Sequence, residues 1–259
     1  MSSLDISIVI PTYRRPDLLA RLLRSLLPLP AGTEVIVVND GTGQTPGYGE
    51  LVEWAKSEFE SFVYIDLPFN QGAPAARNAG IRAARGAWIA LVDDDDEWLP
   101  GKLQQQWAAA QAADSQLGLV YCWVRVVNER GEIESRSTPQ VQGHAAGDIL
   151  RTNFILSPSV LIRRCVFDRV GCFDEVLPSC QDWDMWTRIL CAGYTCQVVP
   201  QELAIYHRHG GASIGLSARA QQGYVMYLRK HWRAILRHTG PINWARKATL
   251  YARLTLGAS

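Results

Sequence analysis

No apolar run in this sequence reaches the ~18 residues that a membrane-spanning helix needs. The first residues, Met1 to Asp5, carry no basic region and lead directly into an apolar stretch, which is not the pattern of a secretory signal. The six cysteines include no Cys-x-x-Cys pair, which argues against a zinc site and is typical of reduced thiols. We therefore expect a cytoplasmic globular protein.

Acidic residues are absent after Glu202, although the whole chain carries 25 Asp and Glu against 26 Lys and Arg. Nine of the cations follow Glu202, interleaved with aromatic side chains such as Trp232 and Tyr251. A basic, aromatic-bearing tail favours peripheral contact with an anionic surface, such as the inner face of a membrane. A pair of packed helices with a solvated basic face explains the same composition, and both readings stay open. Nucleic acid is not expected as a partner.

Apolar runs alternate with helical patterns through the first hundred residues, and 259 residues allow one large domain or two small ones. This alternation predicts an α/β fold with a mostly parallel central sheet and helices on both of its faces. The expected strands are residues 6–11, 34–38, 62–65 and 87–92, and the expected helices are residues 17–27, 50–59 and 75–84.

The rest of the chain is less regular. Residues 135–145 are polar and show no period, and two helices broken at Gly240-Pro241 are expected from about residue 217 onward. Further expected elements are helices at 100–113 and 181–192, strands at 117–127, 158–162, 194–199 and 203–207, and a turn at 128–131. We divide the chain into a domain of residues 1–215, with halves 1–100 and 101–215, and a basic C-terminal helical extension of residues 216–259.

A row of five acidic residues, Asp93 to Glu97, directly follows the apolar strand at 87–92. Open α/β sheets bind ligands at the carboxyl ends of their strands. Adjacent like charges need a positive partner, and a hard divalent cation with oxygen ligands fits. An acidic turn before the helix near Pro100 is the alternative reading. Asp96 and Glu97, the last of the row, are expected to cap that helix near its positive end.

Polar residues also follow the carboxyl ends of the neighbouring strands. Tyr13, Asp40 and Asn70 each come after one expected strand, as Asp95 does. Because parallel strands end at the same edge of a sheet, these four side chains are expected to converge there.

Together these motifs resemble the inverting family 2 glycosyltransferases of the GT-A fold, a Rossmann-like arrangement, over about residues 6–210. Each motif is short, but their order and their placement at strand ends are specific. The resemblance implies transfer of a sugar from a nucleotide-sugar donor, with a UDP-sugar as the first expectation, to a saccharide or lipid-linked acceptor. The motifs are Ile8–Pro16, Val37–Thr42, Asn70–Gly72 with Ala76–Gly80, and Asp93–Pro100.

The resemblance also assigns roles at the donor site. It implies that Asp40 accepts a hydrogen bond from the nucleotide base and that Arg77 lies near the diphosphate, although a surface cation is the alternative for Arg77. The family usually has two acids before the glycine, and Asn39 replaces the first of them. The expected donor-binding residues are Pro11, Thr12, Tyr13, Asp40, Asn70, Arg77, Asp93 and Asp94.

The family's Asp-x-Asp pattern is met by Asp93-Asp94-Asp95. The resemblance implies that Asp95 is a ligand of Mn²⁺ or Mg²⁺, and that Asp93 or Asp94 contacts the ribose or a metal-bound water. Acting as a Lewis acid, such a metal stabilises charge on a leaving nucleoside diphosphate. His209, in a loop followed by two glycines, resembles a family histidine that reaches the metal or the diphosphate; a structural role for it is equally open.

Asp182 stands second in the helix expected at 181–192, where the family usually has Glu-Asp and this chain has Gln181-Asp182. The resemblance implies that Asp182 is the general base that deprotonates the acceptor hydroxyl. Inversion requires such a group on the face opposite the leaving group. An acid that only stabilises the helix N-terminus is the alternative.

Two other functions compete with this one. A nucleotidyltransferase should carry a glycine-rich basic loop after the first strand, and Pro11–Arg15 contains no glycine. A catalytically inert glycan-binding scaffold would be favoured by loss of Asp95 or Asp182, and both are present. The sequence therefore predicts a metal-dependent inverting glycosyltransferase of surface polysaccharide or glycoconjugate biosynthesis.

Overall fold

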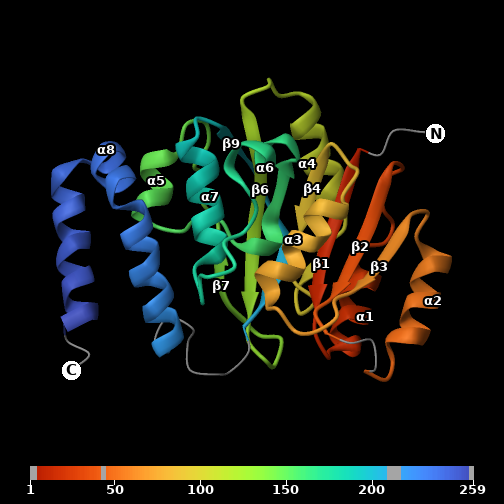
Figure 1. The fold of residues 1–259 in the computed structure, drawn as a ribbon. Helices are drawn as coiled ribbons and strands as arrows, with labels where there is room; N and C mark the ends of the chain where they lie inside the picture. Colours follow the sequence, from red (N-terminus) through yellow and green to blue (C-terminus); the bar gives the residue numbers. More distant parts are fainter. Residues whose placement is uncertain (1–4, 42–44, 209–216, 257–259) are drawn as a thin grey trace.

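The computed structural model describes residues 5–41, 45–208 and 217–256. Within these ranges a nine-stranded sheet carries helices on both faces (Figure 1). The strands are β1 (Ile6–Thr12), β2 (Thr33–Asn39), β3 (Phe62–Asp66), β4 (Trp88–Leu91), β5 (Glu97–Trp98), β6 (Leu117–Val127), β7 (Ile133–Ser137), β8 (Val160–Arg163) and β9 (Thr195–His207). The helices are α1 (Pro16–Ser25), α2 (Tyr48–Glu58), α3 (Ala73–Ala83), α4 (Lys102–Gln111), α5 (Ala146–Arg151), α6 (Cys165–Val170), α7 (Gln181–Cys191) and α8 (Ala218–Leu256), with a short 3₁₀ turn, η1 (Ser157–Ser159).

The predicted parallel sheet is confirmed in the first hundred residues. The strand order is β3-β2-β1-β4-β8-β6-β9-β5, with β7 paired to β6. Strands β3, β2, β1 and β4 run parallel, so Ile8 of β1 pairs with Val35 of β2 and with Ala90 of β4. Strand β8 is antiparallel to both neighbours, and β6 and β9 are again parallel. The parallel half brings the ends of β1, β2 and β4 to one edge.

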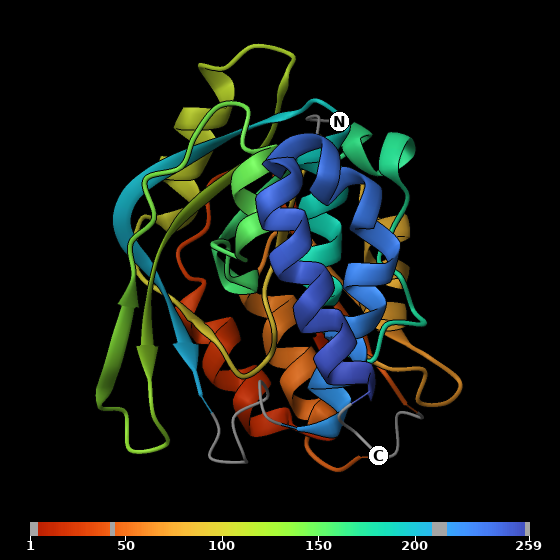
Figure 2. The ribbon, with the colours of Figure 1, turned by 90° about the vertical axis from the view of Figure 1, so that its left-hand side faces the viewer.

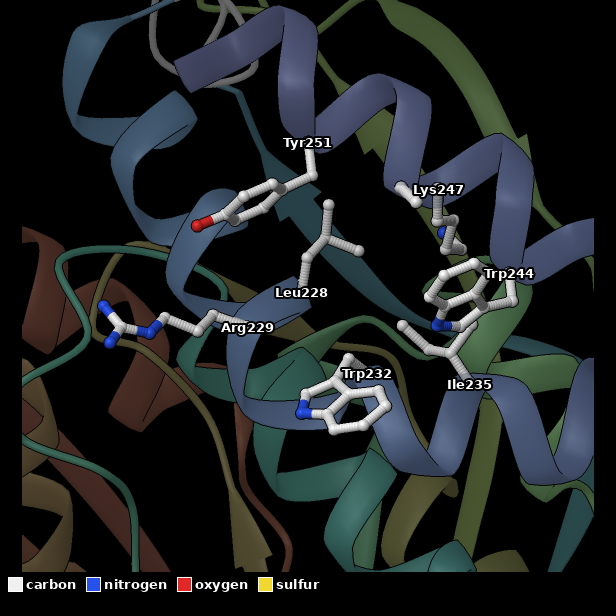
Figure 3. A pocket seen from close by; sticks show the side chains of 8 residues that line it. Leu228, Arg229, Trp232, Ile235, Trp244, Lys247 and Tyr251 are labelled. Atoms are coloured by element: carbon white, nitrogen blue, oxygen red, sulfur yellow. The ribbon is translucent and has the colours of Figure 1, made fainter. Parts of the chain in front are cut away.

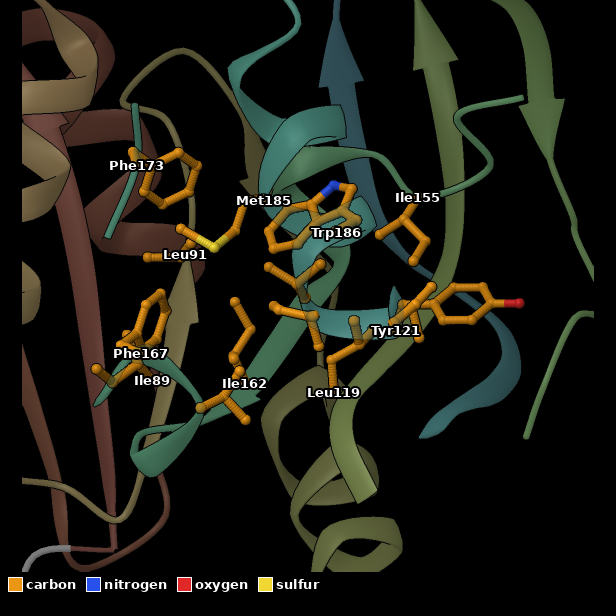
Figure 4. Close-up of a cluster of buried hydrophobic side chains, with 14 of the residues drawn as sticks. Ile89, Leu91, Leu119, Tyr121, Ile155, Ile162, Phe167, Phe173, Met185 and Trp186 are labelled. Atoms are coloured by element: carbon orange, nitrogen blue, oxygen red, sulfur yellow. The ribbon is translucent and has the colours of Figure 1, made fainter. Parts of the chain in front are cut away.

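Two hydrophobic cores lie on opposite faces of the sheet, because successive side chains of a strand point to opposite sides. Val9 belongs to one core, whereas Ile8 and Ile10 belong to the other. Helices α3, α5, α6, α7 and α8 cover the Val9 side, and α1, α2 and α4 cover the opposite side. Figure 4 shows part of the Val9-side core, where Trp186 and Met185 of α7 pack against strand side chains.

Helix α8 consists of two arms that meet at Gly240, whose φ of +80° breaks the helix as the sequence predicted. The arms, residues 218–239 and 241–256, fold back against each other beside α5 and α7 (Figures 1 and 2). Tyr227 and Ile235 of the first arm enter the Val9-side core. Neither α8 nor any other helix of the described residues is long and apolar enough to cross a membrane.

A buried polar network fastens α8 to α7. The Asp184 carboxylate of α7 contacts His231 Nε2 at 2.7 Å and Lys230 Nζ at 2.9 Å, both from α8. Burial alone would raise the pKa of Asp184, but its bond to His231 and the charges of Arg188 and Lys230 lower it to about 2. Asp184 thus contacts α8, whereas Asp182 does not share these partners, and Asp184 holds α8 in place.

The structure differs from the sequence-based prediction mainly in the second half. One strand, β9, replaces the two expected at 194–199 and 203–207, because it continues across a register shift opposite Trp123. The first residues of the segment 135–145, for which no period was found, belong to β7. This strand pairs with β6 across the turn predicted at 128–131. Four of the five β7 residues are exposed, so the strand has no apolar face that an alternating pattern could reveal. Helices α5 and α6 have six residues each, too few to establish a helical period.

Lys102 makes a testable contribution to stability, because it is buried without a carboxylate partner in the described part of the chain. Its Nζ donates to Gln106 Oε1 at 2.6 Å and lies 3.8 Å from the centroid of the Trp98 ring. Burial lowers the pKa of Lys102 from 10.5 to about 8. Between these values the unfolded chain keeps a proton that the folded protein has lost, so the free energy of unfolding rises with pH.

We expect the wild-type protein to gain roughly 2 kcal/mol of stability between pH 7 and pH 10 relative to Lys102→Met. Denaturant unfolding of both proteins, measured at several pH values across this range, gives the difference in their free energies of unfolding. Other groups that lose protons at alkaline pH contribute equally to both proteins and cancel in this difference. A difference that stays constant with pH would contradict the expectation.

Candidate active site

A cavity of about 330 Å³ opens at the carboxyl ends of β1, β2 and β4. It brings together Tyr13, Asp40, Asn70 and Asp95, so their predicted convergence is confirmed. We call it the strand-end cavity. Its other lining residues are Pro11, Thr12, Arg15, Gly72, Ala73, Arg77, Asp93 and Arg219.

Asp40 organises one wall of the strand-end cavity. Its carboxylate oxygens accept hydrogen bonds from the backbone N–H groups of Gln71 at 2.7 Å and Gly72 at 2.8 Å. Asn70 Nδ2 donates to the Asp40 carbonyl at 3.2 Å. Gly72, with a φ of +92°, precedes α3 and directs the helix N-terminus, with Ala73, toward the cavity. A helix N-terminus favours anions, so this wall suits a phosphate.

The side chains of Tyr13 and Asn39, near Asp40, make different contacts. The Tyr13 ring lies so close to Gly41 that a Cβ there would stand 2.9 Å from Tyr13 Cε2, so only glycine leaves room for the ring. Asn39 is buried, and its Nδ2 donates to Asp66 Oδ1 at 2.8 Å, which ties β2 to β3. Asn39 therefore supports the sheet edge, while Tyr13 faces the cavity.

Two arginines neutralise the first three acids of the row. Arg15 contacts Asp94 at 2.5 Å and Asp95 at 2.8 Å, and Arg77 contacts Asp93 at 2.5 Å. Asp93 and Asp95 line the cavity, whereas Asp94 is fully buried behind the wall. Burial raises the pKa of Asp94 to about 7, although its bond to Thr12 and the charge of Arg15 act in the opposite direction. Asp94 therefore holds Thr12 and Arg15 in place.

The expectation that Asp96 and Glu97 cap the following helix is wrong. Helix α4 begins only at Lys102, and Glu97 lies in β5, which pairs with β9. Asp96 is fully buried and accepts the backbone N–H of His207 at 3.2 Å, and burial raises its pKa well above the ordinary value. Glu97 Oε1 contacts His207 Nε2 at 2.7 Å and Arg21 Nε at 3.2 Å. Through His207, both acids therefore connect the acidic segment 93–97 to β9.

The donor set of the strand-end cavity fits a hard divalent cation that keeps waters and shares phosphate oxygens with a ligand. Asp93 and Asp95 present carboxylate oxygens to the same cavity, the ligand type that Mg²⁺ and Mn²⁺ prefer. No three His, Cys, Asp or Glu side chains in the described ranges are arranged to hold a metal by themselves. His209, the other predicted ligand, lies outside the described residues.

Asp182 lies in a second, larger cavity of about 590 Å³, next to the first. It is the second residue of α7 and accepts a hydrogen bond from Asn153 Nδ2 at 3.1 Å. Burial raises the pKa of Asp182, against the opposing hydrogen bonds from the Trp183 backbone N–H and from Asn153. Arg77 and Asp93, which line the first cavity, also act on this pKa through their charges. Arg219 lines the strand-end cavity and the next residue, Ala220, lines the Asp182 cavity, so the two cavities adjoin at the start of α8.

The two tryptophans of α7 occupy different places. Trp186 is fully buried, whereas Trp183 lines the Asp182 cavity. Its ring stacks on Tyr227 and Tyr224 of α8, with centroids 4.4 and 5.5 Å away, and its Nε1 donates to the Ile149 carbonyl at 2.7 Å. Helix α8 thus builds an aromatic wall next to Asp182.

Three residues of the site were not predicted. Arg15 stands in the loop after the first strand, so its position offered a signal, but its partners are 79 and 80 residues away. Asn153 lies outside every expected element and Arg219 at the start of an expected helix, and only the fold brings them to the cavities. Arg219 Nε donates to the Pro178 carbonyl at 3.0 Å, which places the start of α8 over the strand-end cavity.

Comparison with known proteins defines the class to which this fold and site belong. The family model described as glycosyl transferase family 2 matches residues 7–167. The chain therefore belongs to glycosyltransferase family 2, a family of enzymes, and its sheet is that of the GT-A fold. It is 30% identical over 220 residues to the succinoglycan biosynthesis protein ExoO of Rhizobium meliloti, covering 80% of this chain. The chain spans 62% of ExoO's length.

Two solved structures share the fold. S. aureus TarS 1–349 in complex with UDP-GlcNAc superposes with a TM-score of 0.71 and 21% identity, over 97% of this chain and 71% of that one. The mannosyltransferase PcManGT from Pyrobaculum calidifontis, in complex with GDP-Man and Mn²⁺, has a TM-score of 0.69 and 20% identity, over 96% of this chain and 69% of that one. At these identities the likeness extends to the fold alone.

Proposed function

We propose that this protein transfers a sugar, with inversion and in a metal-dependent reaction, from a nucleoside-diphosphate sugar to an acceptor hydroxyl. The observation that carries the proposal is the pair of adjoining cavities: one is lined by Asp93 and Asp95, the other by Asp182, and the consecutive residues Arg219 and Ala220 line one each. In this proposal the leaving group is stabilised in the strand-end cavity, and the acceptor proton is removed in the adjoining Asp182 cavity.

The donor nucleotide occupies the strand-end cavity in this proposal. Pro11, Thr12 and Tyr13 line the nucleoside part, and Asp40 receives a hydrogen bond from the base. The diphosphate lies between the N-terminus of α3 and Arg77, whose buried Nε has no hydrogen-bond partner in the described chain. The UDP-GlcNAc and GDP-Man complexes of the two structural neighbours support a nucleotide-sugar donor, and a UDP-sugar is our first choice.

Mn²⁺ or Mg²⁺ would be held by Asp95, with Asp93 toward the ribose or a metal-bound water. When bound, such a cation supplies Lewis-acid stabilisation of the charge on the leaving diphosphate. Arg15 keeps Asp95 oriented, and Asp94 keeps Arg15 in place. The Mn²⁺ in the PcManGT complex supports a divalent cation in this role.

Asp182 acts as the general base. Its carboxylate accepts the proton of the acceptor hydroxyl as that oxygen attacks the anomeric carbon from the side opposite the diphosphate. The transition state is oxocarbenium-like, as in glycoside hydrolysis. The acceptor, a saccharide or a lipid-linked saccharide, occupies the Asp182 cavity. The naming of ExoO supports a place in polysaccharide biosynthesis, and the basic α8 supports a position in the cytoplasm at the inner face of the membrane.

A donor panel tests this proposal. The purified protein is incubated with UDP-, GDP- and dTDP-sugars, with Mn²⁺, Mg²⁺ or EDTA, and release of the nucleoside diphosphate is measured. We expect release from at least one donor, abolished by EDTA, and the anomeric configuration of the product, read by NMR, to be opposite to that of the donor. Absence of binding and turnover with every donor would refute the proposal, and a retained configuration would refute inversion.

Asn153→Ala tests the environment of the base. The Asn153 hydrogen bond lowers the pKa of Asp182, so its removal should raise that pKa and move the acidic limb of the kcat/KM profile to higher pH. The profile is measured for both proteins from pH 4 to about pH 8, a window set by an ordinary aspartate pKa of about 3.9. An acidic limb that stays in place while activity falls would mean that Asn153 acts on something other than the base.

A further inference from the structure

The two arms of α8 form more than a packing surface. A cavity of about 250 Å³ lies between Leu228, Trp232 and Ile235 of the first arm and Trp244 and Tyr251 of the second (Figure 3). The Asp182 cavity also reaches between the arms, because Tyr224 of the first arm and Leu250 and Leu254 of the second line it. We call this interface between the arms, with both cavities, the α8 seam.

Lys247 stands at the junction of the two cavities of the α8 seam. It lines the 250 Å³ cavity, while its Nζ donates to Tyr224 Oη at 3.1 Å and to the Arg151 carbonyl at 3.3 Å. The same ammonium lies 5.4 Å from the centroid of the Trp183 ring, which lines the Asp182 cavity. The contacts of Lys247 Nζ in the described residues are with a carbonyl, a hydroxyl and aromatic rings, none of them a carboxylate, and burial lowers the pKa of Lys247. A half-buried cation without a counter-charge favours an anionic ligand.

Apart from Arg229 and Lys247, the 250 Å³ cavity of the α8 seam is lined by Leu228, Trp232, Ile235, Trp244, Ala248 and Tyr251, and the surroundings of the seam are basic. Trp232 is 46% exposed and Ile242 73% exposed, and cations such as Arg229 and Arg233 lie on the same helix. The chain contains no Asp or Glu beyond residue 202. A free saccharide needs many hydrogen-bonding partners, and the 250 Å³ cavity offers it few. An amphiphile with a hydrocarbon chain and an anionic group matches both features.

We propose that the α8 seam binds the hydrocarbon chain of a lipid-linked acceptor. The hydrocarbon chain of the acceptor lies in the 250 Å³ cavity, and the phosphate that links lipid and saccharide contacts Lys247. The terminal sugar packs against Trp183 and places a hydroxyl group at Asp182. This inference rests on the proposed function in taking Asp182 as the base. It makes α8, outside the matched residues 7–167, the element that selects a lipid-linked acceptor.

Binding of simple amphiphiles tests the inference without any donor. Farnesyl phosphate, farnesol and inorganic phosphate are titrated into the full-length protein by calorimetry, below the micelle concentration of the amphiphiles. We expect farnesyl phosphate to bind most tightly, farnesol more weakly, and inorganic phosphate not measurably. Equal affinity for farnesyl phosphate and farnesol would overturn the role of Lys247.

Two pairs of variants locate the binding. Lys247→Met should weaken farnesyl phosphate binding about tenfold or more, the value of a hydrogen bond to a charged group, and leave farnesol binding unchanged. Arg246→Met removes the same charge from an exposed neighbour that lines neither cavity and should change little. Ala248→Phe fills the 250 Å³ cavity and should abolish binding of both amphiphiles, whereas Ala245→Phe on the exposed side should not.

Several results would overturn the inference. Affinities that fall equally in Ala248→Phe and Ala245→Phe would place the amphiphile elsewhere, as would binding only to anionic phosphatidylglycerol vesicles, unaltered by Lys247→Met and Ala248→Phe. A dimer that Ala248→Phe dissociates and farnesyl phosphate does not would assign the seam to a second copy of the chain. Nucleotide binding is measured on the same unaltered protein: if it fails while farnesyl phosphate binds, the proposed function fails and the seam site stands.

Discussion

Asp182→Asn is expected to lower the rate of sugar transfer by about 10²–10⁴-fold, the range typical of a lost general base. The amide has nearly the shape of the carboxylate but cannot take the acceptor proton. Donor binding should stay unchanged, because Asp182 lies in the cavity next to the strand-end cavity. Steady-state transfer rates and nucleotide affinity by calorimetry measure the two parts of this expectation.

The control for Asp182→Asn is Asp168→Asn, which removes an exposed acid from the first turn of another helix, α6. It should leave transfer unchanged. Because burial raises the pKa of Asp182, its ionised form costs folding free energy at neutral pH, and Asp182→Asn should melt no lower than the wild-type protein. Transfer that survives in Asp182→Asn, or a loss matched by lowered stability, would reduce Asp182 to a helix-terminal acid.

Asp95→Asn is expected to lower metal-dependent transfer by about a hundredfold or more, which corresponds to several kcal/mol of lost charge stabilisation. The amide keeps an oxygen ligand but loses the negative charge that draws a divalent cation into the strand-end cavity. Arg15 stays anchored by Asp94, so the wall should keep its shape. Transfer rates measured against Mn²⁺ concentration should show a weaker apparent metal affinity.

Glu58→Gln is the matched control for Asp95→Asn, since it removes one negative charge from the exposed end of α2. Its metal dependence should equal that of the wild-type protein. An Asp95→Asn variant with an unchanged metal requirement would show that other groups hold the cation, and transfer without any metal requirement would show that Arg15 and Arg77 stabilise the leaving group by themselves.

The strand-end half of the site could be predicted because its residues follow buried parallel strands. Tyr13, Asp40, Asn70 and Asp95 each follow an apolar strand within a few residues, and parallel register brings them to one edge. In this half of the sheet, a residue that follows a strand in the sequence lies at the same edge as those that follow the neighbouring strands. The strand pattern alone therefore predicts which of these residues line the strand-end cavity.

The Asp182 cavity could not be predicted to this depth, because its walls come from elements packed at long range. The motif pointed to Asp182, but the position of Trp183 depends on Tyr224 and Tyr227 of α8, which no local pattern connects to it. The roles of Asp96 and Glu97 were missed because their partner, His207, is more than 100 residues away in β9. Acidic residues just before an expected helix suggest a helix cap, and only the position of β9 shows that Asp96 and Glu97 pair with His207 instead.

The most direct test of the account is the melting temperature of the unaltered protein with UDP, GDP, CDP and dTDP, each with and without Mn²⁺. We predict that at least one nucleoside diphosphate raises the melting temperature only when Mn²⁺ is present, corresponding to about 2.7 kcal/mol at a hundredfold excess over Kd. The same nucleotide should lose this effect in Asp95→Asn. A melting temperature that no nucleoside diphosphate changes, with or without metal, would contradict a metal-dependent nucleotide-sugar site at the ends of β1, β2 and β4.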